Sequence, residues 1–177
     1  GVISQHCDSA QPQLVAQENN AFGCGYNSDM TEQAPSAHIT AAIWHWNVYY
    51  QAAIEAAMAC EGDGSKFVEK MGGNAYYAGL AEGFVDASPV NEAVAAPHTA
   101  AVMDAVRALI KSGEWDVFSG VKLSYNISDD GKVEVIRTDA DLVDADLNVI
   151  VEAGGPSVDD GIIKGSMNYN VAGVEEG

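Results

Sequence analysis

Three short runs of polar and aromatic residues have the chemistry to bind a flat, polar ligand. Each of them follows a stretch that is expected to form a β-strand: His6-Cys7-Asp8-Ser9, then Asn27-Ser28-Asp29, then Trp44. Their carboxylates, hydroxyls and amides exchange hydrogen bonds, and an indole stacks on a planar ring. These residue types favour recognition of a ring system with polar groups on its edge.

The elements that must position these runs are strands that alternate with helices. Strands are expected at 1–5, 21–26, 37–41, after 75–85 and at 115–119, and helices at 12–19, up to about 60 and at 97–112. This alternation predicts an α/β fold, a three-layer α/β/α sandwich with a mostly parallel sheet. Because ligands bind at the carboxyl ends of strands in such sheets, the three runs should converge on one edge. Asp8 or Ser9 is also expected to cap the first helix.

The stretch 38–51, HITAAIWHWNVYYQ, is predicted to be a short strand followed by a long helix. An apolar stripe at helical spacing should form the core side of this helix. It consists of Trp46, Tyr50, Ala53, Ile54, Ala57 and Met58. Trp44 would lie in the first turn, about 200° round the helix from Trp46. The prediction therefore leaves Trp44 free to contact a ligand and places Trp46 in the core.

The pattern changes after residue 120. Alternating residues on both sides of Asp129-Asp130-Gly131 predict a β-hairpin. The stretch 138–150 is expected to form a short helix, and the stretch 154–165 a turn-rich linker. The predicted domain organisation is an α/β ligand-binding lobe over 1–120, followed by hairpin and return segments over 121–177.

The composition excludes some partners. The chain has 26 acidic and 8 basic residues, a net charge of −18, which argues against nucleic acid and anionic membrane surfaces. It has no apolar run of about 18 residues, the length that a membrane-spanning helix requires. The three cysteines have no CxxC spacing and at least one must be unpaired. Buried free thiols are predicted for Cys7, Cys24 and Cys60, with proximity of the first two as an alternative.

No metal or cofactor is predicted. His6 and Asp8 resemble a pair of metal ligands, but no further His or Cys has suitable spacing, so a hydrogen-bonding role in a cleft or a capping role is favoured. The acidic run 139–146, DADLVDAD, lacks the glycine and terminal glutamate of an EF-hand loop.

An ordered set of segments resembles the carboxyl-terminal part of the basic membrane protein family. These proteins are substrate-binding lipoproteins of ABC importers, related to bacterial purine-nucleoside-binding proteins. The segments are VISQHCDSAQPQLVAQE, GCGYNSDM, HITAAIWHWNVYY and YYAGLAEGFV, with IKSGEWDVFSG and SMNYNVAGV later in the chain. The resemblance implies one lobe of a type I periplasmic binding protein, with the family's first lobe expected to precede residue 1 and absent from this chain.

The resemblance also implies a function and a site. The expected ligand is a purine base or nucleoside, bound without chemistry in a cleft between two lobes; another flat heterocycle such as a flavin stays open. The expected partner is an ABC transporter permease, and the full-length protein is expected in the periplasm or outside the cell, anchored as a lipoprotein. Either Trp44 or Trp46 would stack on the base. Asp29 would accept hydrogen bonds from it or from ribose, and His6 and Asp8 would line the rim.

Two other classes of function are alternatives to a solute binder. An α/β enzyme such as a nucleoside hydrolase would need a carboxylate cluster at one loop, or a nucleophile elbow of the GxSxG type. The sequence contains neither, so the chain is not expected to be an enzyme. The second alternative is a ligand-sensing or structural lobe without a role in transport.

Overall fold

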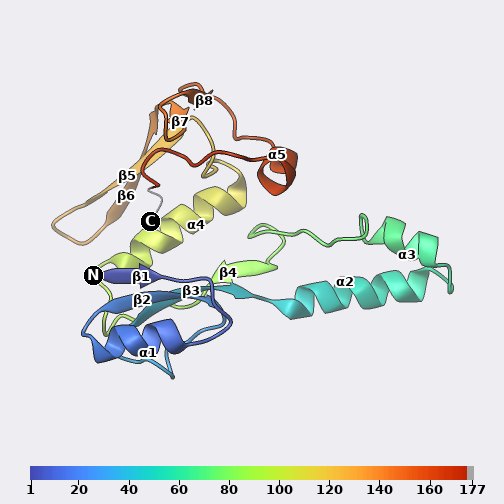
Figure 1. Ribbon diagram of the computed structural model, residues 1–177, viewed down its shortest axis with the longest axis horizontal. Helices are drawn as coiled ribbons and strands as arrows, with labels where there is room; N and C mark the ends of the chain where they lie inside the picture. The colour runs from blue at the N-terminus through green and yellow to red at the C-terminus, as the bar shows by residue number, and fades with distance from the viewer. Residues whose placement is uncertain (175–177) are drawn as a thin grey trace. The chain divides into compact units, whose positions relative to one another are not determined.

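The computed structural model describes residues 1–174 and divides the chain into two compact units (Figure 1). The first unit comprises Gly1–Ala100 and contains all the residues that the sequence nominates for ligand binding, and the second begins at Ala101. No helix within residues 1–174 combines the length and the apolar character needed to cross a membrane.

The first unit is built on a four-stranded sheet in the order β1-β2-β3-β4. Its strands are β1 (Val2–Ser4), β2 (Phe22–Asn27), β3 (His38–Trp44) and β4 (Val85–Ala87). The first three are parallel, and β4 is antiparallel to β3. The prediction of an α/β fold with a mostly parallel sheet is therefore confirmed.

Helix α1 (Gln11–Glu18) packs against β1 and β2 (Figure 1). Ala16 of this helix forms a small core with Ala34 and Ala37, which lie just before β3. Alanine side chains bring the backbones close together, so this core is thin and little apolar area is buried in it.

The start of α1 differs from the prediction. Ala10 occupies the N-cap position, so neither Asp8 nor Ser9 caps the helix. The Ser9 hydroxyl accepts a hydrogen bond from the Gln11 backbone N–H (3.2 Å), but Ser9 lies one residue before the N-cap position. Asp8 instead lies near the end of β2, where its carboxylate accepts a hydrogen bond from the Asn27 side-chain amide (3.4 Å).

Strand β3 is longer than predicted, and this changes the place of Trp44. The strand continues to Trp44 because β4 pairs with its last three residues, Trp44 lying opposite Val85. The His45 N–H then donates to the Phe84 carbonyl (2.8 Å), and helix α2 (Trp46–Ala59) begins one residue later. Trp44 is therefore the last residue of a strand and not part of a helix, so the predicted 200° separation from Trp46 is wrong.

The apolar stripe of α2 is not the core side of the helix. Trp46, Tyr50, Ile54 and Met58 are all exposed, Met58 by 79%. The buried positions Ala56 and Cys60 lie on another face, and α3 (Gly64–Lys70) lies alongside the end of α2 (Figure 1). The prediction fails because spacing identifies a continuous apolar face but not what covers it.

The second unit is built from short hairpins. Helix α4 (Thr99–Ser112) leads to β5 (Val121–Ile127) and β6 (Val133–Asp139), which pair in antiparallel register. The predicted hairpin at Asp129-Asp130-Gly131 is therefore confirmed. The Ser128 N–H donates to the Lys132 carbonyl (3.0 Å) across this turn, and Gly131 supplies the positive φ of 80° that closes it.

Three segments of the second unit differ from the predictions. Residues 115–119 form a turn and not a strand, because the Asp116 carboxylate accepts from the Phe118 N–H (3.0 Å). The expected short helix at 138–150 is a hairpin of β7 (Leu142–Val143) and β8 (Val149–Val151). The expected linker contains helix α5 (Asp160–Gly165), which Asp159 caps. Local side chain–backbone hydrogen bonds select these conformations over the periodic pattern.

The three cysteines are free, and they differ in burial. Cys60 is buried, as predicted, and Cys24 is half-buried in β2, where burial raises the pKa of its thiol. Cys7 is exposed, so the prediction of burial is wrong for it. It lies beyond the end of β1, where the chain has already left the sheet.

Candidate functional site

A small pocket lies at the carboxyl ends of β1 and β2. Its volume is about 160 Å³. Carboxylate, hydroxyl and amide side chains dominate its lining, which consists of Asp8, Ser9, Ala10, Tyr26, Asn27, Ser28, Met30 and Gln33. The first two predicted runs therefore meet at one place, as the topology of a parallel sheet requires.

A row of aromatic rings runs along the same edge of the sheet. His6 follows β1 and lies against Tyr26 at the end of β2 (ring centroids 4.4 Å apart), and Tyr26 meets Trp44 at the end of β3 edge to face (6.4 Å). Beyond Trp44 the row continues with rings from α2 and from the segment before β4. We define the aromatic row as His6, Tyr26, Trp44, Trp46, Tyr49, Tyr50, Tyr76 and Phe84.

The two tryptophans stack on each other. Their ring centroids are 5.7 Å apart and their planes are inclined by 29°. Both contact Phe84, which is 5% exposed and anchors the middle of the row. Trp46, in contrast, is 48% exposed, although the stripe predicted it in the core. An anchored row with open ring faces is suited to stacking on a planar molecule.

Tyr26 joins the row to the pocket, because it belongs to both. The stacking surface of the aromatic row therefore lies beside the hydrogen-bonding groups of the pocket. The sequence contained a signal for this residue, since Tyr26 immediately precedes the run Asn27-Ser28-Asp29 at a strand end. Phe84 and Gln33 carried no comparable signal, because neither lies in a predicted run.

Asp29 takes a different place from the one expected of a ligand contact. It is not among the residues that line the pocket. Its carboxylate accepts hydrogen bonds from the Thr31 N–H (2.9 Å) and the Thr31 hydroxyl (2.6 Å), and it lies 3.5 Å from the Nε2 atom of His38. At Asp29 the loop after β2 therefore turns back towards His38, at the start of β3.

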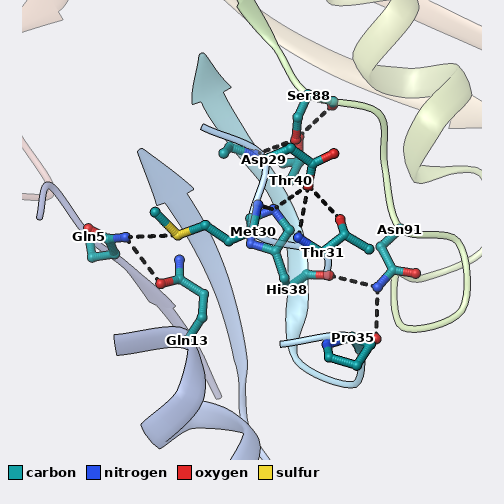
Figure 2. A network of polar contacts seen from close by, with 11 residues as sticks. Gln5, Gln13, Asp29, Met30, Thr31, Pro35, His38, Thr40, Ser88 and Asn91 are labelled. Atoms are coloured by element: carbon teal, nitrogen blue, oxygen red, sulfur yellow. Dashed lines mark hydrogen bonds and ion pairs between the residues drawn. The ribbon is translucent and has the colours of Figure 1, made fainter. Parts of the chain in front are cut away.

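A network of polar side chains extends from α1 past β2 and β3 to the segment after β4 (Figure 2). His38, Gln13 and Ser88 are fully buried. The Ser88 hydroxyl accepts a hydrogen bond from the Ala41 N–H of β3 (2.9 Å), and the Asn91 amide donates to the His38 carbonyl (3.0 Å). These bonds tie the segment after β4 to β3 and fix the start of β3, on which the loop over residues 28–33 rests.

The charge around the pocket is negative. Residues 1–65 contain no Lys or Arg, and the only cationic side chains of the first unit are Lys66 and Lys70 in or next to α3. Asp8 lines the pocket, and Asp29 lies between two residues that line it, Ser28 and Met30. A site of this charge repels phosphate groups and favours ligands that donate hydrogen bonds.

Metal binding finds no support in the arrangement of side chains. Within residues 1–174, no three or more His, Cys, Asp or Glu side chains gather in a way that could hold an ion. In the run 139–146, the Asp144 carboxylate accepts hydrogen bonds from the backbone N–H groups of Asp146 (2.9 Å) and Asn148 (2.8 Å). The Asn148 side-chain amide also donates to this carboxylate (2.9 Å) and does most to lower the pKa of Asp144, and the backbone hydrogen bonds lower it further.

Fold and candidate site define an α/β domain whose open aromatic and polar groups gather at the carboxyl edge of a mostly parallel sheet. No protein-family model matches the chain. The chain is similar to a purine-binding protein of Brucella abortus (strain 2308), with 29% identity over 119 residues. The match covers 67% of this chain but 31% of that protein, so the chain spans about a third of its relative's length.

Proposed function

We propose that the chain is the ligand-binding part of a solute-binding protein, which binds a purine base or nucleoside without chemistry. The observation that carries the proposal is the aromatic row, which follows the carboxyl edge of the sheet and shares Tyr26 with a polar pocket. The name of the Brucella abortus relative supports a purine as the class of ligand.

The binding mode combines stacking with hydrogen bonds. A purine ring stacks on an indole of the row, Trp44 or the more exposed Trp46, and such a contact contributes about 1–3 kcal/mol per base. The pocket beside Tyr26 takes the polar part of the ligand. There the Asp8 carboxylate accepts hydrogen bonds from ring N–H, amino or ribose hydroxyl groups, and charge assistance strengthens these bonds. His6 forms the rim next to Tyr26.

The charge of the site selects among purine compounds. No Lys or Arg precedes residue 66, so a phosphate near the pocket would meet carboxylates and no cation. The proposed ligand is therefore a base or a nucleoside and not a nucleotide.

The wider role follows from the resemblance to the basic membrane protein family. This resemblance supports the proposal that the chain is the second lobe of a type I periplasmic binding protein, which would close on its ligand with a further lobe. The full-length protein would be an exported lipoprotein, in the periplasm or outside the cell, that delivers its ligand to the permease of an ABC importer. The negative charge of −18 is compatible with this role, because neither nucleic acid nor an anionic membrane surface has to be bound.

The test is a titration of tryptophan fluorescence in the full-length protein. Adenine, adenosine, guanosine, inosine and riboflavin are the probes, AMP is the charged control, and the probes are analysed chemically afterwards. We expect saturable quenching by one purine, recovery of that purine unchanged, and weaker binding of AMP than of adenosine. Conversion of the probe would establish an enzyme instead, and saturation by riboflavin alone would replace the purine by a flavin. No response to any probe would contradict the proposed function.

A further inference from the structure

The His38 imidazole is enclosed on every side although it lies next to the candidate site. It is fully buried, and an ideal Cβ atom on Gly25 of β2 would lie 3.0 Å from its Cε1 atom. The backbone of His38 is fixed as well, because its N–H donates to the Ala34 carbonyl (2.8 Å) and its carbonyl accepts from Asn91 (3.0 Å). The ring therefore has little room to turn away from its neighbours.

The Nε2 atom of this ring faces two groups that make opposite demands on it. The Met30 backbone N–H donates a hydrogen bond to Nε2 (3.4 Å), which requires a lone pair on that nitrogen. The Asp29 carboxylate lies 3.5 Å from the same nitrogen and gains a hydrogen bond only if Nε2 carries a proton. One nitrogen cannot satisfy both groups at once. The Nδ1 atom has no hydrogen-bond partner among the described residues and offers no alternative.

We propose that His38 is a positioning residue whose protonation exchanges the Met30–His38 hydrogen bond for an Asp29–His38 ion pair, and so moves the turn that lines the pocket. In the neutral ring, Nε2 accepts from Met30 and holds the turn as the structure shows it. When Nε2 takes up a proton from solvent, the Met30 N–H loses its acceptor and the Asp29 carboxylate gains a donor. The consequence for ligand affinity rests on the proposed function.

The displaced turn is part of the wall of the pocket. Ser28, Met30 and Gln33 line the pocket directly, and Asp29 lies between the first two. Figure 2 shows the Met30 side chain extending from the His38 ring towards Gln5 and Gln13. The Gln5 amide donates to the Met30 Sδ atom (3.7 Å) and to the Gln13 side-chain carbonyl (3.1 Å). A shift at the Met30 backbone therefore changes the wall of the pocket.

The charges around the ring determine the direction of the effect. Among the described residues, Asp29 is the charged group within ion-pair distance of the imidazole, and the neighbours from α1 and β2, Gln13 and Gly25, are uncharged. Burial lowers the pKa of His38 below its usual value, and Asp29 opposes this shift in part. The neutral form therefore prevails at neutral pH, and the exchange takes place as the pH falls below about 6.5.

The exchange itself can be tested without any ligand. In the full chain, the amide signal of Met30 is followed by NMR from pH 8 to pH 5, together with the ring signals of His38. We expect the Met30 signal to shift with the same midpoint as the His38 ring. In Asp29→Asn the midpoint should move to lower pH, because the ion pair no longer favours the proton. A Met30 signal that stays constant over this range would overturn the proposal.

Two variants separate His38 from the other histidines. His38→Gln keeps an oxygen that can accept from the Met30 N–H but cannot be protonated, so the pH-dependent shift of Met30 should disappear. His98→Asn is the control: His98 is exposed and has a φ of 68°, a conformation that asparagine tolerates. It should leave the shift unchanged. Persistence of the shift in His38→Gln would assign it to another group and refute the role of His38.

The effect on binding is measured with adenosine at pH 8 and pH 5. We expect wild-type affinity to fall about two- to tenfold on acidification, the equivalent of one hydrogen bond, and to fall less in His38→Gln. Asp8 and His6 are the same in both proteins, so the difference between the two pH profiles isolates His38. Equal profiles would overturn the coupling. If adenosine bound at neither pH, the proposed ligand would be wrong, while the Met30 signal would still decide whether the exchange takes place.

Discussion

Strand β3 carries a different kind of cluster at each of its ends. At its start, the His38 ring is fully buried between Gln13 of α1, Gly25 of β2 and the loop after β2. At its end, Trp44 stacks on Trp46, which is 48% exposed. One end of the strand thus buries a polar ring, and the other leaves large aromatic rings open.

The neighbouring elements explain the difference. At the start of β3, Gly23 and Gly25 of β2 have no side chains, so Gln13 of α1 and the His38 ring approach the strand closely. At the other end the parallel strands run out, and α2 leads away from the sheet (Figure 1). The comparison teaches that neighbouring elements enclose the polar groups around His38 and hold the backbone there in place, whereas they leave the end of the aromatic row at Trp46 open to solvent.

The largest effect should follow from filling the space beside Gly25. A Cβ atom there would lie 3.0 to 3.2 Å from His38, Gln13 and Met30, so Gly25→Val forces a buried cluster apart. We expect a loss of about 3 kcal/mol in the free energy of unfolding, measured by urea denaturation. The matched control is Gly64→Val in α3, where no atom lies within 4 Å of the added Cβ and the change should stay within about 0.5 kcal/mol.

If Gly25→Val were as stable as Gly64→Val, the polar cluster would not be tightly packed. The contrast between the two ends of β3 would then lose its physical basis.

The next effect concerns the hydrogen bond between Ser88 and β3. Ser88→Ala leaves the Ala41 N–H buried without an acceptor, because the Ser88 hydroxyl accepts from it at 2.9 Å. We expect a loss of about 2 kcal/mol in the free energy of unfolding. Ser36→Ala removes an exposed hydroxyl that donates to Gln17 (2.8 Å), so it should cost far less. Equal losses from both variants would contradict a special role for the buried hydrogen bond.

Much of the first unit could be predicted from local sequence. The strands predicted at 1–5 and 21–26 coincide with β1 (Val2–Ser4) and, to within one residue, β2 (Phe22–Asn27), although β1 is exposed. The convergence of residues 6–9 and 27–29 follows from parallel topology. The burial of His38 could not be predicted, because it depends on side chains that are missing from β2 and on a loop that returns beneath it.

The errors near Trp44 and in the second unit have a common physical origin. The extension of β3 to Trp44 requires β4, which lies more than 40 residues later in the chain and pairs with it. In the second unit, nearby backbone N–H groups donate hydrogen bonds to the carboxylates of Asp116 and Asp144, and these bonds fix turns where periodicity predicted a strand and a helix. The apolar periodicity of a segment reflects that segment alone. It therefore indicates neither a distant strand that pairs with the segment nor a carboxylate that fixes a turn within it.

At the open end of β3, a substitution should change the affinity for the purine. Trp44→Ala removes the ring that connects Tyr26 to Trp46, and we expect at least tenfold weaker binding of the purine identified by fluorescence, measured by calorimetry. Tyr125→Ala is the control, because Tyr125 is an exposed tyrosine of β5 outside the aromatic row, and affinity should stay unchanged. Unchanged affinity in Trp44→Ala would remove this residue from the binding site.

The smallest effect is expected on the exposed stripe of α2, which continues the aromatic row away from the sheet. Ile54 is 60% exposed, so Ile54→Lys should change the free energy of unfolding by less than about 0.5 kcal/mol. Ala56→Lys, on the buried face of the same helix, should cost several times more, because a charged group would have to leave water. Urea denaturation of both variants measures the difference. If Ile54→Lys proved the more damaging of the two, the stripe would be a covered surface, and the open end of β3 would be confined to the tryptophan pair and the rings next to it.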